Sequence, residues 1–124
     1  MWRSRETGAR KQGARTRNDG NASPMGLVIG VCRVRLRLPE NHSLKGKRQV
    51  LKSLVARLHN KFNVSAAEVD DQDSWQIASI AVAYASNEER HANQVLAAVV
   101  SFIESERPDA EVLDYETEMI HGVL

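Results

Sequence analysis

Three cations crowd the start of a predicted helix, where they could bind an anion. Lys45, Lys47 and Arg48 follow Ser43, whose hydroxyl is a typical N-cap acceptor. Each cation in the first turn is unfavourable by about 0.3–1 kcal/mol, because the helix macrodipole is positive there. Gly46 adds a cost of about 0.5–1 kcal/mol relative to alanine in a helix interior. Several unfavourable residues in succession indicate a functional site, and the free N–H groups of a helix N-terminus bind anions.

Cations continue along one flank of the same helix. In a helical projection, Lys45, Arg48, Lys52 and His59 fall on one side of the helix axis. We therefore predict that this flank binds phosphate groups, with Ser43 at the helix start as part of the site. The same spacing is equally typical of a helix flank that contacts only solvent.

Three arginines alternate along the first predicted strand. Arg33, Arg35 and Arg37 lie opposite to the apolar residues and so project from the open side of the sheet. Arg33 and Arg35 are included in the predicted anion-binding set. We favour an alternative, pairing inside the molecule, because the last strand should lie beside the first and opposite charges across strands contribute about 0.2–1 kcal/mol per pair. The acids of that last strand are Asp114, Glu116 and Glu118.

Other reactive side chains lack the spacing of a catalytic or metal site. Asp70, Asp71 and Asp73 are better explained by a hairpin turn than by a cation site, since aspartate bonds locally to the backbone. The four histidines lack zinc-ligand spacing, and Cys32 lies alone on a strand as a small core residue. Glycine-rich phosphate loops are missing. We therefore expect no metal, no cofactor and no enzymatic activity.

Periodicity in the sequence predicts the elements that position these residues. Alternating apolar residues predict strands, and apolar residues at helical spacing predict helices. Strands are expected at about 26–38, 63–70, 75–85 and 110–120, with helices at about 44–61 and from a cap at Ser86 or Asn87 to Pro108. The order β-α-β-β-α-β with right-handed crossovers predicts an α+β, ferredoxin-like fold. Its four-stranded antiparallel sheet has the order 4-1-3-2, with both helices on one face.

The same alternation predicts which side chains of the first and last strands face the helices. On the first strand these are Val28, Cys32, Val34, Leu36 and Leu38. On the last strand these are Leu113, Tyr115, Thr117 and Met119, which alternate with acids.

Charge is distributed unevenly along the 124 residues, although the formal net charge is +1. Residues 1–24 carry six basic and two acidic side chains and few apolar ones, so we expect a disordered basic extension before a domain at 25–124. Residues 33–61 carry nine basic side chains and one acid, whereas residues 68–118 carry thirteen acids and two bases. This asymmetry indicates either a polyanionic partner or pairing between the two halves. A single cysteine, with no apolar run near the roughly 20 residues that cross a bilayer, indicates a cytoplasmic protein without a membrane partner.

Short segments spread over most of the predicted domain are similar to a known family. They are 28–34 (VIGVCRV), 42–48 (HSLKGKR), 62–64 (FNV), 68–69 (EV), 71–73 (DQD), 75–76 (WQ) and 86–87 (SN). On these segments, residues 25–120 resemble the YlxP-like family, a bacterial family of uncharacterised function. The resemblance implies a ferredoxin-like domain, and the family's gene neighbours, translation initiation and ribosome maturation factors, imply a ribosomal setting. Gly46 departs from the family pattern, because relatives commonly carry glutamate there.

Together these features predict a non-catalytic RNA- or ribosome-associated binding module, acting in ribosome maturation or translation. RNA or a ribosomal subunit is the expected partner. Trp75 is the one strong candidate for base stacking, because the first strand carries arginines where RNA-recognition sheets carry aromatic residues. The alternative is a homodimeric protein-interaction module without nucleic-acid binding. It would use the open sheet face, where Leu27, Ile29 and Val31 lie beside the charges.

Overall fold

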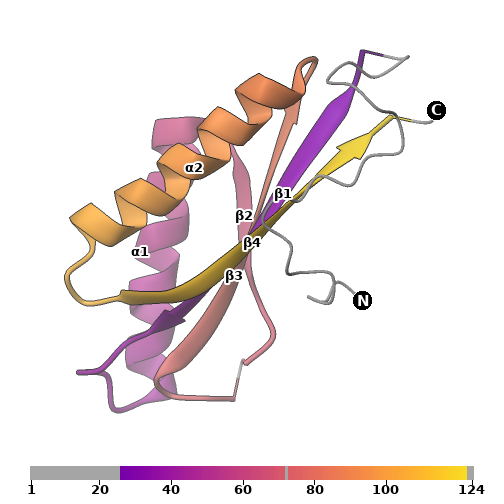
Figure 1. Cartoon of the computed structure of the whole chain (residues 1–124). Helices are drawn as coiled ribbons and strands as arrows, with labels where there is room; N and C mark the ends of the chain where they lie inside the picture. Colours follow the sequence, from indigo (N-terminus) through magenta and orange to yellow (C-terminus); the bar gives the residue numbers. More distant parts are fainter. Residues whose placement is uncertain (1–25, 72, 123–124) are drawn as a thin grey trace.

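The computed structural model describes residues 26–71 and 73–122, which contain four strands and two helices (Figure 1). They are β1 (Val28–Arg37), α1 (Leu44–Phe62), β2 (Ser65–Val69), β3 (Ile77–Ser86), α2 (Glu89–Glu106) and β4 (Glu111–His121). The predicted N-terminal extension at 1–24 and the domain start at residue 25 lie outside the described residues.

The four strands form one antiparallel sheet in the order β2-β3-β1-β4. Counted from the β4 edge, this is the sequence 4-1-3-2. Both helices cover the same face of the sheet, so the structure has one layer of helix and one layer of strand (Figure 1). The predicted α+β class is confirmed. The strand order also places β2 and β4 at the two edges, which matters for the site below.

The core lies between the sheet and the two helices. As expected, the apolar alternation of β1 faces the helices: Val28, Cys32, Val34, Leu36 and the following Leu38 are buried. Leu51, Leu54 and Leu58 of α1 and Leu96, Val99 and Ile103 of α2 complete the cluster. Each fully buried aliphatic side chain stabilises the fold by about 1.5–3 kcal/mol relative to exposure.

A glycine lets α2 approach the sheet closely. Gly30 is buried on the helix-facing side of β1. A Cβ atom at this position would lie 2.9 Å from Leu96 Cδ1 and 3.3 Å from Ala92 Cβ, both in α2. These distances are shorter than ordinary van der Waals contact, so any larger side chain would push α2 away from β1.

The predicted starts of β2 and α2 are wrong, each for a local reason, and β3 also begins two residues later than predicted, at Ile77. β2 begins at Ser65 rather than at 63, because Asn63 is the left-handed C-cap of α1 (φ 55°, ψ 44°) and its N–H bonds to the His59 carbonyl. Neither Ser86 nor Asn87 is the N-cap of α2. Glu88 occupies that position without a side-chain cap, and the Ser86 hydroxyl bonds to the Glu88 backbone instead.

A β-bulge changes which side chains of β4 are buried. The pairing of β1 with β4 shifts between Arg35 and Leu36, so that Val112 rather than Leu113 lies opposite Leu36. Met119 is buried as expected, but Leu113 is 40% exposed and Tyr115 is 53% exposed. Leu113 is the extra residue of the bulge, which the alternation does not reveal, so the prediction that it faces the core is wrong. Tyr115 lies outside the bulge, opposite the buried Val34, yet its side chain is exposed on the edge strand and is not buried as predicted.

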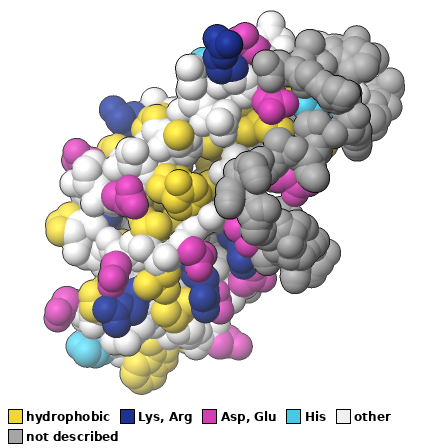
Figure 2. All heavy atoms as spheres, in the orientation of Figure 1, with side chains coloured by type: hydrophobic (Ala, Val, Ile, Leu, Met, Phe, Trp, Pro, Cys, Tyr) yellow, Lys and Arg dark blue, Asp and Glu magenta, His cyan; other side chains and the backbone are white. Residues whose placement is uncertain are grey.

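Neither described helix is long and apolar enough to cross a membrane. On the side where α2 and β4 lie toward the viewer, basic and acidic side chains are intermixed around apolar ones (Figure 2). This mixed surface differs from the exposed side of α1, which is described next.

Candidate nucleic-acid interface

Ser43 begins α1 as its N-cap. Its backbone is extended, and its hydroxyl accepts a hydrogen bond from the Gly46 amide at 2.9 Å. The Asn41 side chain fixes the preceding loop by donating to the carbonyls of Ser43 (2.7 Å) and Trp75 (2.6 Å). A Cβ atom at Gly46 would collide with Asn41 Oδ1. Glycine at position 46 therefore leaves space for the side-chain amide of Asn41, which fixes the start of α1. This explains why a glycine, which is otherwise unfavourable in a helix, occupies this position.

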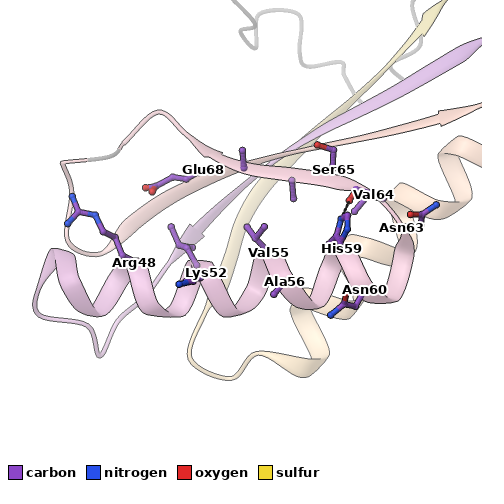
Figure 3. Close-up of a pocket in the computed structure, with 13 residues that line it drawn as sticks. Arg48, Lys52, Val55, Ala56, His59, Asn60, Asn63, Val64, Ser65 and Glu68 are labelled. Atoms are coloured by element: carbon purple, nitrogen blue, oxygen red, sulfur yellow. Dashed lines mark hydrogen bonds between the residues drawn. The ribbon is translucent and has the colours of Figure 1, made fainter.

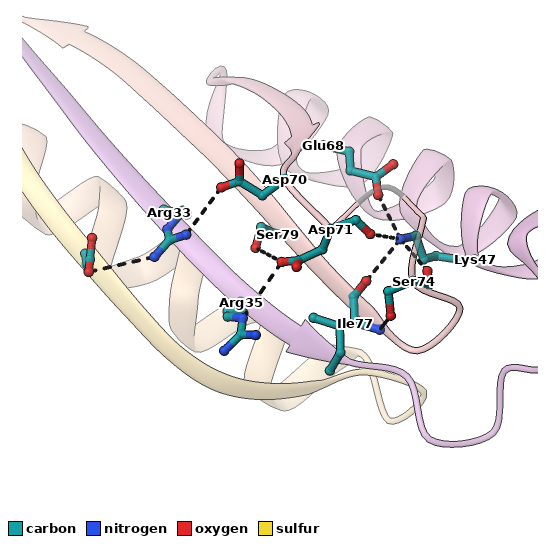
Figure 4. Close-up of polar contacts among 10 residues, drawn as sticks. Arg33, Arg35, Lys47, Glu68, Asp70, Asp71, Ser74, Ile77 and Ser79 are labelled. Carbon is teal, nitrogen blue, oxygen red and sulfur yellow. Dashed lines mark hydrogen bonds and ion pairs between the residues drawn. The ribbon is translucent and has the colours of Figure 1, made fainter. Parts of the chain in front are cut away.

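Lys47 is buried rather than available to a ligand, with its side chain 1% exposed. Its ammonium donates to three carbonyl oxygens of the β2–β3 hairpin: Asp71 (2.7 Å) and Ser74 (2.7 Å) in the loop and Ile77 (3.0 Å) at the start of β3 (Figure 4). An ammonium has three N–H donors, and all three are used here. Lys47 was predicted to bind an anion, but its ammonium is fully used inside the protein, where it stabilises the hairpin.

Glu68 compensates the charge of this ammonium. Its Oε2 lies 3.1 Å from Lys47 Nζ, but no N–H of the lysine remains to be donated to it. The Glu68 carboxylate therefore interacts with Lys47 through charge alone. Glu68 lies on β2, the first strand of the same hairpin (Figure 4).

The arginines of β1 are paired with acids, as the favoured interpretation predicted. Arg33 Nη1 lies 3.3 Å from Asp70, and its Nη2 lies 3.8 Å from Glu116 of β4. Arg35 Nε lies 3.8 Å from the Asp71 carboxylate, which also accepts a hydrogen bond from Ser79 (Figure 4). Arginines engaged in this way are poor ligands for phosphate.

The predicted partners on β4 are only partly correct. Arg37 pairs with Glu111 at 3.0 Å, a residue that the prediction did not include. Asp114 lies opposite Arg35 in the β1–β4 register, yet Arg35 is paired with Asp71 of the hairpin. Glu118 lies opposite Val31 and not opposite an arginine.

The exposed side of α1 is basic and lacks acids. The helix sequence contains six Lys or Arg residues and no Asp or Glu. Apart from Lys47, all of its cations are exposed: Lys45, Arg48, Lys52, Arg57 and Lys61. Within residues 26–71 and 73–122, the ion pairs involve other cations, namely Arg33, Arg35, Arg37, Lys47, Arg107 and His121. Among the described residues, the arginines of β1 and the buried cations thus have acidic partners, whereas the five exposed cations of α1 have none.

A groove of about 930 Å³ runs between α1 and the edge strand β2 (Figure 3). Arg48, Lys52 and His59 line it from α1, on the flank that the helical projection predicted. The apolar residues that line it are Leu51, Val55, Ala56, Val64, Ala66 and Ala67. His59 Nδ1 donates to the Val64 carbonyl at 3.0 Å, which fixes the ring beside the end of the groove. Lys45 is exposed one turn before Arg48, outside the groove.

The aspartates after β2 form the expected turn. Asp70 and Asp71 both adopt left-handed conformations (φ 49° and 52°), which aspartate tolerates better than most residues. Within the described part of the chain, no cluster of His, Cys, Asp and Glu could hold a metal ion. Trp75 lies exposed in this loop, ahead of β3, rather than on the sheet face.

Cys32 is a core residue. It is fully buried in β1, and desolvation raises the pKa of its thiol to about 11, although a hydrogen bond with Thr117 opposes that shift. A thiol with such a pKa stays protonated at neutral pH and is a poor nucleophile.

Two buried polar groups were not found from the sequence. Arg107 Nη2 pairs with Asp109 at 2.8 Å and its Nη1 donates to Ser53 of α1 at 3.1 Å, which ties the end of α2 to α1. His121 Nε2 lies 2.9 Å from Glu89 at the start of α2. Ser53 and Glu89 lie far from their partners in the chain, so no short-range pattern marks these contacts.

Comparison with known proteins identifies the family of this chain. Residues 29–117 match the family model described as "Protein of unknown function (DUF503)". The chain belongs to this family. It is also 40% identical over 84 residues to the uncharacterized protein YlxP of Bacillus subtilis (strain 168), in a match that covers 64% of this chain and 91% of the relative. The predicted YlxP-like family is thereby confirmed, and neither description states a biochemical activity.

Proposed function

We propose that this protein is a non-catalytic RNA-binding module of the cytoplasm, and that it binds ribosomal RNA through the exposed side of α1. The element order and antiparallel sheet support a ferredoxin-like assignment within the α+β class. One observation carries the proposal: the five exposed cations of α1, Lys45, Arg48, Lys52, Arg57 and Lys61, have no carboxylate partner among the described residues, whereas Lys47 and the arginines of the sheet do. A polyanion is the natural counterpart of such a surface.

The charges are spaced to follow a nucleic-acid backbone. Lys45, Arg48, Lys52 and His59 lie along one flank of α1, and the separation of 14 positions between the first and the last spans about 21 Å at a rise of about 1.5 Å per residue. The neutralisation of phosphates releases counterions, so such binding weakens with salt. For single-stranded RNA, the slope of log affinity against log salt is about −0.7 per phosphate contacted.

The salt dependence of variants tests the proposal. We expect a triple variant, Lys45→Gln, Arg48→Gln and Lys52→Gln, to lower the magnitude of the slope by about 2. Between about 50 and about 200 mM salt, the wild type should then lose about 20-fold more affinity than the variant does. Fluorescence anisotropy with labelled fragments of ribosomal RNA measures both quantities.

The matched control is Arg90→Gln, which removes an exposed cation from α2 rather than α1. Its slope should equal that of the wild type. The basic residues of 1–24 are present in every variant, so the difference in slope isolates α1. Equal slopes for the triple variant and the wild type would exclude α1 as the RNA-binding surface.

A homodimer through the open sheet face is the second candidate. On that face a hollow of about 460 Å³ is lined by small apolar residues, among them Val31, Ala67, Ala81 and Ala83, with the exposed Ile120 beside them. Light scattering distinguishes the candidates. A dimer that persists at high salt, in a protein without measurable RNA affinity at low salt, would favour the second.

A further inference from the structure

The groove between α1 and β2 combines two surfaces that differ in chemistry. Cations of α1, Arg48 and Lys52, lie on one rim, and Figure 3 places them on the helix side, across from Ser65 and Glu68 of β2. Between the rims are apolar side chains, among them Val55 and Ala66. A ligand that fills this groove must therefore present negative charge toward α1 and apolar surface toward the sheet.

The second rim is the free edge of the sheet. β2 pairs with β3 on one side only, and the strand order leaves its other side without a neighbouring strand among the described elements. Alternate residues of an edge strand direct their N–H and C=O groups away from the sheet. The edge of β2, Ser65–Val69, thus offers donors and acceptors to a planar group that lies in the groove.

Glu68 is the one carboxylate that lines this groove. Its Oε2 lies 3.1 Å from Lys47 Nζ, so its negative charge is compensated from inside the protein. The groove therefore keeps a positive balance from Arg48 and Lys52.

We infer that the groove takes single-stranded RNA in an extended conformation, an inference that rests on the proposed RNA-binding function. Phosphates lie along Arg48 and Lys52, and unstacked bases lie on the apolar floor with their edges toward β2. In an RNA duplex the bases are stacked and paired, so a duplex reaches only the cations and gains nothing from the floor. A single strand uses both surfaces, since unpaired bases offer both their faces and their hydrogen-bonding edges.

A substitution that fills the groove without changing charge tests the inference. Ala56 lies exposed on α1 and lines the groove, so Ala56→Leu places a larger side chain at the helix rim of the groove while keeping every cation. Leucine favours helix, and the variant should fold. The matched control is Ala98→Leu, at an exposed position of α2 away from the groove.

The affinities of the full chain for a labelled single-stranded RNA and for a hairpin duplex of the same composition should be measured by anisotropy. We expect the wild type to bind the single strand at least tenfold more tightly than the hairpin. Ala56→Leu should weaken single-strand binding at least fivefold, with an unchanged salt slope and unchanged hairpin binding. Ala98→Leu should behave as the wild type.

The outcomes separate this inference from the proposed function. Equal affinity for single strand and hairpin, or an Ala56→Leu variant that binds the single strand as the wild type does, overturns the inference while RNA binding itself stands. Failure of the wild type to bind either RNA at low salt overturns both. A labelled glutamate-rich peptide provides the last arm: if it binds where RNA does not, the groove takes an extended acidic peptide along β2 instead.

Discussion

Replacement of Lys47 by methionine tests the structural role of its ammonium. The substitution keeps a long, flexible side chain but removes the donor that holds the carbonyls of Asp71, Ser74 and Ile77 and compensates Glu68. Removal of one partner from a buried ion pair costs about 3–5 kcal/mol, because the remaining charge loses its compensation. Since Glu68 is 20% exposed and can regain some water, we expect the free energy of unfolding to fall by about 3 kcal/mol.

Urea unfolding followed by far-UV circular dichroism measures this loss. With a slope of about 1–3 kcal/mol per molar urea, the midpoint should fall by about 1–3 M. Lys45→Met is the matched control in the same helical turn; it is exposed, and its effect should stay within about 0.5 kcal/mol. A second substitution, Glu68→Gln in the Lys47→Met background, should recover about 1 kcal/mol by removing the uncompensated carboxylate.

The reasoning would be refuted if Lys47→Met and Lys45→Met had the same midpoint. It would also be refuted if Lys47→Met weakened RNA binding as much as Lys52→Gln does while the protein remained folded, because Lys47 would then contact the ligand.

Three further predictions concern two buried residues of β1 and the dependence of stability on pH. The Cys32 thiol, with a pKa of about 11, should resist thiol reagents at mildly alkaline pH until the protein is unfolded. Rapid labelling of the native protein would contradict the burial of this thiol. Gly30→Val should lower the free energy of unfolding by about 1–3 kcal/mol, because the new side chain overlaps Leu96, and urea titration measures this change. Hydrogen bonds from Arg107 hold the pKa of the Asp109 carboxyl below its ordinary value of 3.8, so the stability that this pair contributes is present above that pH and is lost as the pH falls through the lowered pKa. The stability difference between wild type and Asp109→Asn, measured by thermal unfolding across pH, should therefore shrink on acidification and not on alkalinisation.

Local patterns in the sequence were sufficient to predict the helix-facing side of β1 and the N-cap at Ser43. Alternation and capping depend on neighbours in the chain, and the structure keeps them as expected. The charged contacts were harder to predict. The carbonyl partners of Lys47 lie 24, 27 and 30 residues further along the chain, in a loop whose carbonyl directions no sequence pattern specifies.

One available signal for Lys47 was its position in the helix. It lies four residues before Leu51 and so in phase with Leu51, Leu54 and Leu58, the buried stripe of α1. A lysine in phase with a buried stripe must either extend to solvent or find partners inside. The predicted acid partners of Arg35 and Arg37 were wrong for a different reason: Arg35 pairs with the hairpin acid Asp71, and the bulge in β4 places Glu111 opposite Arg37.

The groove was predicted only in part. The cationic flank with Arg48, Lys52 and His59 followed from helical spacing, and the expected strand order already implied that β2 is an edge strand. The apolar floor depended on how α1 packs against β2, which is a tertiary property that periodicity does not contain.

The two helices share one face of the sheet but carry opposite charge. α1 has six basic residues and no acids, whereas α2 has three glutamates and a single arginine. In the field of an approaching polyanion, attraction at α1 and repulsion at α2 produce a torque that rotates the protein before contact. An incoming RNA should therefore meet the protein in a narrow range of orientations, and reversal of the charge on α2 alone should change the association rate more than the dissociation rate.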